Sequence, residues 1–113
     1  MGTWCGPCRE SLLENSDSIK THFQNKGLDY LYVANHDESN PAKWKKLIPY
    51  YNLSGTNILA SKTLTEDIMQ KVKGEGYPTY LIIKRDGSFE LSKAGAPMNR
   101  NVLYKQLEDA LTD

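Results

Sequence analysis

Two cysteines near the start of the chain have the residue type and spacing for redox chemistry. Cys5 and Cys8 are separated by Gly6-Pro7 and preceded by Trp4. A proline at this place suits the first turn of a helix, so the pair is predicted to lie at a helix N-terminus. There the unpaired N–H groups and the helix dipole favour a thiolate at Cys5, below the ordinary pKa of a free thiol.

This spacing predicts thiol–disulfide exchange. The Cys5 thiolate would attack a substrate disulfide, and Cys8, about one helical turn further in, would resolve the mixed disulfide by attacking Cys5. Pro7 fixes the local φ, and Gly6 leaves room for a partner chain to approach. Trp4 would shield one side of the pair. No cofactor is required, because the electrons reside in the two cysteines.

A zinc site and a chance C-x-x-C are the competing interpretations of the pair. A structural zinc site needs four ligands, and His22 and His36 do not fall at the spacing of zinc-finger histidines. Two cysteines are also too few for a disulfide-scaffold protein. We therefore predict no metal. Copper or zinc handling by the pair is the alternative, and a measurement of metal stoichiometry under reducing conditions tests it.

Length and composition indicate one soluble globular domain spanning residues 1–113. Hydrophobic residues make up 39% of the chain and charged residues 25%, which argues against disorder. The net charge is zero and the lysines are scattered, so neither a nucleic-acid nor an anionic-membrane surface is predicted. No apolar run approaches the ~18 residues of a membrane-spanning helix.

The elements that would position the cysteines follow from caps, turns and apolar spacing. We expect helices over 8–26, 41–51, 65–73 and from Asn99 or Asn101 onward, strands over 28–34, 80–84 and 88–92, and an irregular segment over 52–62. Asp86-Gly87 is predicted to be a hairpin turn. Short strands alternating with helices indicate a layered α/β fold with one antiparallel hairpin.

Several other side chains could be mistaken for site residues. The adjacent acids Asp37-Glu38 are expected to cap or be solvated near a helix start, rather than to do catalysis. His36 is expected to be a loop histidine, although its place after a strand could put it beside a site. Three aromatic residues of the 41–51 helix are expected to pack in the core, with a groove as the alternative: Trp44, Tyr50 and Tyr51.

Three stretches carry a resemblance to a known family. They are residues 2–10 (GTWCGPCRE), residues 76–83 (GYPTYLII) and Asp86-Gly87. Together they resemble the thioredoxin superfamily, and more closely its TlpA-like branch of bacterial extracytoplasmic thiol:disulfide interchange proteins. The resemblance implies a three-layer α/β/α sandwich with a mixed sheet. It implies a protein-disulfide oxidoreductase with Cys5 and Cys8 as its redox-active centre, in the periplasm or cell envelope.

The resemblance also assigns roles near the cysteines. Pro78 would be a cis-proline beside the pair, and Tyr77 would present backbone groups to a substrate strand; an ordinary proline leading a strand is the alternative. The Gly-Pro dipeptide between the cysteines resembles reducing members. The implied partners are protein dithiol or disulfide substrates and an upstream thiol reductase. The alternative function is a binding or redox-sensor module of a larger envelope protein, using the Tyr77-Pro78 groove with little turnover.

The chain departs from the family pattern in two ways. Ser11 and Leu13 stand where many TlpA-like proteins have a glutamate and a proline, so neither carboxylate-assisted proton transfer nor cytochrome c maturation is implied. The cysteine motif also begins at residue 4, without the strand that precedes it in the family. We therefore expect a piece of a longer protein, truncated at the N-terminus, with exposed strand edges through which a second copy could associate.

Overall fold

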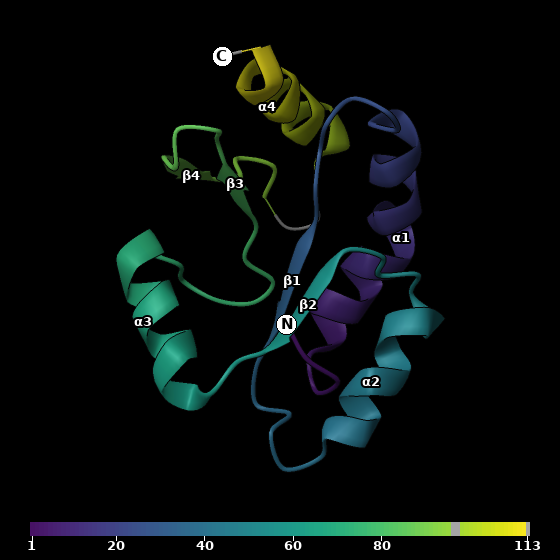
Figure 1. Ribbon diagram of the computed structural model, residues 1–113, viewed down its shortest axis with the longest axis vertical. Coiled ribbons are helices and arrows are strands. Elements are labelled where there is room, and N and C mark those ends of the chain that lie inside the picture. The colour runs from purple at the N-terminus through teal and green to yellow at the C-terminus, as the bar shows by residue number, and fades with distance from the viewer. Residues whose placement is uncertain (96–97, 113) are drawn as a thin grey trace.

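A computed structural model describes residues 1–95 and 98–112 (Figure 1). The described residues form four helices and four short strands in the order α1 Gly6–His22, β1 Leu31–Ala34, α2 Pro41–Tyr50, β2 Thr56–Leu59, α3 Lys62–Val72, β3 Leu81–Ile83, β4 Phe89–Leu91 and α4 Arg100–Thr112. The predicted α/β class is confirmed. The strands form two separate two-stranded sheets, β1-β2 and β3-β4.

Helix α1 begins two residues earlier than predicted and ends four residues earlier. Its start is set by Cys5, which is the N-cap residue, and by Pro7 in the first turn. Its end follows from the left-handed backbone of Asn25 and Gly27, whose φ angles of 62° and 81° are incompatible with a continuing helix. The helix therefore places the cysteine pair at its N-terminus, as predicted.

The first sheet contains a strand that the sequence did not reveal. β1 pairs in parallel with β2, with Leu31 opposite Thr56 and Ala34 opposite Leu59. Residues 52–62 were expected to be irregular, and this was wrong for 56–59. The segment Thr-Asn-Ile-Leu has a weak strand preference of its own, so the pairing with β1 decides its conformation. Helix α2 connects the two strands, as parallel pairing requires.

One predicted helix cap differs from the observed one, and for the last helix the structure selects one of the two predicted caps. Helix α3 is capped by Ser61, whose hydroxyl accepts from the Leu64 N–H at 3.1 Å, and not by Thr65. Thr65 lies inside the helix, where its hydroxyl bonds back to the Ser61 carbonyl. At the last helix, the Asn99 side chain accepts from the Val102 N–H at 3.4 Å, which selects Asn99 over Asn101.

The predicted hairpin is confirmed. β3 and β4 are antiparallel, with Leu81 opposite Leu91. In the turn between them the Asp86 carboxylate accepts from the Ser88 N–H at 2.9 Å, and Gly87 adopts a φ of 87°. The hairpin packs into the main apolar core with the end of α1 and with α4. The buried members of this core are Phe23, Ile82, Ala94, Leu103 and Leu107.

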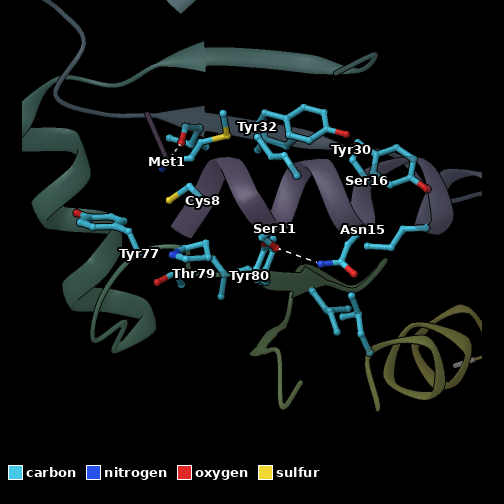
Figure 2. Close-up of a pocket in the computed structure, with 18 of the residues that line it drawn as sticks. Met1, Cys8, Ser11, Asn15, Ser16, Tyr30, Tyr32, Tyr77, Thr79 and Tyr80 are labelled. Carbon is cyan, nitrogen blue, oxygen red and sulfur yellow. Dashed lines mark hydrogen bonds between the residues drawn. The ribbon is translucent and has the colours of Figure 1, made fainter. Parts of the chain in front are cut away.

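A cavity of about 370 Å³ separates the two sheets. Figure 2 shows α1 running along it, with Tyr30 and Tyr32 on the β1 side and Thr79 and Tyr80 on the side that leads into β3. Met1 lies at one end of the cavity (Figure 2). The sheet is therefore interrupted between β1 and β3, so a continuous central sheet is absent from the described residues.

Candidate redox site

The two cysteines form a disulfide at the N-terminus of α1. Their Cα atoms lie 5.3 Å apart and the Cys5–Cys8 bond is closed. The Cys8 N–H donates to the Cys5 Sγ at 3.2 Å, and the Arg9 N–H donates to the Cys5 carbonyl at 3.1 Å. Because a free helix N–H points at Sγ, the same geometry would stabilise a Cys5 thiolate after reduction.

Both cysteines are buried, with 4% of Cys5 and 1% of Cys8 exposed. The two residues between them are exposed, so the disulfide is bordered by solvent along the Gly6-Pro7 edge. A Cβ at Gly6 would meet nothing within 4 Å, which means that this edge is open. The more buried Cys8 is the better candidate for the resolving thiol, and Cys5 for the attacking one.

The loop that carries Cys5 is held by residues that follow β1. The Asp37 carboxylate accepts from the Thr3 N–H at 2.9 Å and from the Thr3 hydroxyl at 2.6 Å. The Asn35 carbonyl accepts from the indole N–H of Trp4 at 2.6 Å. Asn35 and Asp37 are both buried. The chain before the disulfide is thus fixed by hydrogen bonds to a segment more than thirty residues away.

Gly2 is required by this close packing. A Cβ built at Gly2 would collide with the Trp4 indole and would lie only 2.7 Å from the Asn35 carbonyl oxygen. The tight approach of the loop to the end of β1 therefore makes any side chain at this position destabilising, because neighbouring atoms would have to shift.

Three rings form a rim beside the disulfide. The Trp4 and His36 rings meet edge to face with centroids 5.3 Å apart, and Trp4 and Tyr77 do so at 5.5 Å. His36 adopts a left-handed φ of 60°, which turns its ring back toward this cluster. Trp4 is 45% exposed. The ring cluster therefore leaves an aromatic surface accessible next to the cysteines.

The Tyr77-Pro78 peptide bond is cis, as the resemblance implied. Cys8 and Pro78 line the same cavity, and Figure 2 shows Tyr77 and Thr79 near Cys8. The chain entering β3 thus lies beside the disulfide, although it is distant in sequence. The substrate-binding roles of Tyr77 and Pro78 stay predictions.

The other positions singled out from the sequence have mixed outcomes. Ser11, one turn beyond Cys8, pairs with the phenol of Tyr80 in the cavity. Burial raises the pKa of Tyr80, and the Ser11 hydroxyl partly opposes this. Asp37 was expected to cap a helix or be solvated, and this was wrong because it is buried against Thr3. The only sequence signal for its role is a polar run directly after a strand.

The expected core packing of the α2 aromatic residues was wrong for Tyr50. Its side chain is 74% exposed, because it falls on the solvent side of α2 while Leu47 fills the buried side. Tyr51 is half-buried and its hydroxyl accepts from the Arg9 guanidinium Nε at 3.1 Å. The alternative, that these rings line a groove, holds for Tyr50 and Tyr51.

Within residues 1–95 and 98–112, no three histidine, cysteine or acidic side chains are grouped so as to hold a metal ion. No helix in the same part of the chain is long and apolar enough to cross a membrane. Comparison with known proteins found no matching family model, no similar curated protein and no similar solved structure.

Proposed function

We propose that the protein is a thiol–disulfide oxidoreductase that reduces protein disulfides through Cys5 and Cys8. The observation that carries the proposal is the Cys5–Cys8 disulfide at the start of α1, with a helix N–H directed at Cys5 Sγ and an open edge at Gly6. A helix N-terminus lowers the pKa of a cysteine thiol, which supplies the nucleophile for disulfide exchange near neutral pH.

The reaction has two exchange steps. The Cys5 thiolate attacks one sulfur of the substrate disulfide, forms a mixed disulfide and releases the other substrate sulfur as a thiolate, which takes up a proton. The Cys8 thiolate then attacks Cys5 Sγ, closes the Cys5–Cys8 disulfide and releases the second substrate thiol. Two electrons pass to the substrate. An upstream dithiol reductase supplies two further electrons that reduce the Cys5–Cys8 disulfide again and is itself oxidised to a disulfide, and no other cofactor takes part.

The wider setting of this function is inferred from the resemblance. The substrates are protein disulfides, with Tyr77 and Pro78 as the place where a substrate strand lies, and the location is the periplasm or cell envelope. The hydrogen bonds of the disulfide loop support a fixed and reusable site, because Thr3 and Trp4 are held by partly buried hydrogen bonds to Asp37 and to the Asn35 carbonyl.

We infer that the finer architecture is a thioredoxin-like three-layer α/β/α sandwich whose sheet has a gap of one strand between β1 and β3. The cavity between the sheets supports this. The Met1 amino group donates to the Val33 carbonyl at 3.1 Å, and the Asn35 N–H donates to the Met1 carbonyl at 2.7 Å. This is the bonding pattern of a parallel strand beside Ala34, so a strand joined to Met1 would continue along β1 into the cavity.

Redox titration combined with cysteine variants tests the function. The wild-type protein is equilibrated with glutathione buffers while tryptophan fluorescence is followed, and reduction of insulin is measured in parallel. We expect a potential near about −270 mV, as in reducing thiol–disulfide proteins, rather than about −120 mV, as in strong oxidants. Cys8→Ser should trap a mixed disulfide with the substrate, and Cys5→Ser should trap none.

The matched serine variants also distinguish the enzyme from the binding-module alternative. Insulin reduction that disappears in both variants supports the enzyme. Peptide binding that survives both substitutions, in a wild-type protein without disulfide turnover, would refute the proposal in favour of a non-turnover module.

A further inference from the structure

We propose that a groove between the first turn of α1 and helix α2 binds an acidic segment of the protein substrate, next to the disulfide that is reduced. This inference rests on the proposed function and specifies the class of substrate. The groove has a volume of about 190 Å³ and is lined by three cationic side chains, two tyrosines and a leucine. These residues are Arg9, Lys43, Lys46, Tyr50, Tyr51 and Leu47.

The groove lies directly beside the redox site. Arg9 follows Cys8 in the first turns of α1, and its backbone N–H is bonded to the Cys5 carbonyl. Thr3, which the buried Asp37 holds in place, also lines the groove. A chain bound in the groove would therefore be held within a few residues of the open edge at Gly6.

Its lining joins an apolar base to a cationic rim. Leu47 is buried, whereas Arg9, Lys43 and Lys46 are exposed. The Arg9 side chain is fixed across the groove by its hydrogen bond to the Tyr51 hydroxyl. Tyr50, 74% exposed, adds a ring on which apolar parts of a peptide can pack. Such a surface suits a peptide that carries carboxylates beside apolar side chains.

The positive charge is local to this face, because the chain as a whole has no net charge. Between Glu38 and Glu66 the sequence contains four lysines and no acidic residue. None of the three groove cations is paired with a carboxylate in the described part of the chain. Glu10, the acid next to Arg9 in sequence, lies about 100° away from Arg9 around α1.

The experiment compares three peptides that share one central disulfide and differ only in their flanks, which are acidic, neutral or basic. Exchange with the reduced protein is followed by stopped-flow tryptophan fluorescence. We expect the acidic peptide to react about tenfold faster than the neutral one at low salt. This preference should shrink toward equal rates at about 0.5 M salt, because the attraction is screened.

Charge reversal on α2 provides the matched comparison. The double variant Lys43→Glu, Lys46→Glu should abolish or reverse the preference for the acidic peptide. Lys45→Glu reverses one charge on the same helix, where the double variant reverses two, at an exposed position outside the groove, and should leave the preference in place. Far-UV circular dichroism and thermal unfolding show whether each variant is folded.

The outcomes separate this inference from the proposed function. Equal rates for the three peptides would overturn the acidic-substrate inference and leave the oxidoreductase standing. If no peptide reacts, the proposed function fails. Whether the groove binds acidic peptides is then decided by a separate binding measurement. The oxidised protein is titrated with an acidic peptide whose cysteines are replaced by serine, followed by fluorescence anisotropy. Binding that the double variant weakens and Lys45→Glu does not upholds the groove, and any other pattern refutes it.

Discussion

Removing the Asp37 carboxylate should loosen the loop that carries the disulfide. The carboxylate accepts two hydrogen bonds from Thr3, at 2.9 and 2.6 Å, and is only 5% exposed. A hydrogen bond to a charged group contributes about 1.5–3 kcal/mol. Asp37→Ala therefore costs about 3 kcal/mol of unfolding free energy, taking the lower value for each bond. This corresponds to a fall in Tm of roughly 12 °C for a domain of this size.

The assay is urea unfolding of the oxidised protein, followed by tryptophan fluorescence and by circular dichroism. Thr3→Val removes only the hydroxyl donor and should cost about half as much, since the backbone N–H still reaches the carboxylate. Glu38→Ala is the control, because it deletes the adjacent exposed acid. The double-mutant cycle between Thr3 and Asp37 should give a coupling energy above about 1 kcal/mol.

Either of two results would refute this reasoning. The free energy of unfolding of Asp37→Ala could lie within about 0.5 kcal/mol of that of Glu38→Ala, a difference no larger than ordinary surface substitutions produce. Alternatively, the cycle could show no coupling between Thr3 and Asp37. In both cases the hydrogen bonds would not be what fixes the loop.

Three further predictions follow from other parts of the molecule. Gly2→Ala should cost about 2 kcal/mol in urea unfolding, because its Cβ collides with Trp4, whereas Gly6→Ala, which meets open space, should change stability by less than about 1 kcal/mol. Burial raises the pKa of Tyr30, Tyr32 and Tyr80, so the fold prefers the neutral phenols. Their contribution to stability is complete below the unfolded pKa of about 10 and is lost as pH rises through the higher folded values. Urea unfolding midpoints measured from pH 8 to 11 check this, because the midpoint should fall as the pH rises. If Tyr32→Phe shows the same dependence of the midpoint on pH as the wild-type protein, the prediction is contradicted. Finally, five apolar β-branched residues fused ahead of Met1 should raise the unfolding free energy by about 3 kcal/mol. A fusion of equal length containing prolines should not, and equal effects of both would argue against a strand site in the cavity.

Features that depend on a few neighbouring residues could be predicted from the sequence. Cys5 and Pro7 define the start of α1, Asn40 caps α2 through the Lys43 N–H, and Asp86-Gly87 makes the hairpin turn. In each case the hydrogen bond or fixed φ lies within about three residues, so the local sequence is sufficient to specify it. The cis bond before Pro78 was expected from a family resemblance and not from local chemistry.

The surroundings of the disulfide were decided by the tertiary structure. The bonds from Asn35 and Asp37 to the cysteine loop join residues more than thirty positions apart, and β2 becomes a strand through its pairing with β1. The exposure of Tyr50 follows from which side of α2 faces the protein. Sequence patterns show the spacing of residues along the chain, but they do not show which distant backbone segment those residues will contact. The chain itself thus determines the reactive pair and its helix, whereas only packing determines what holds the pair and which surfaces lie beside it.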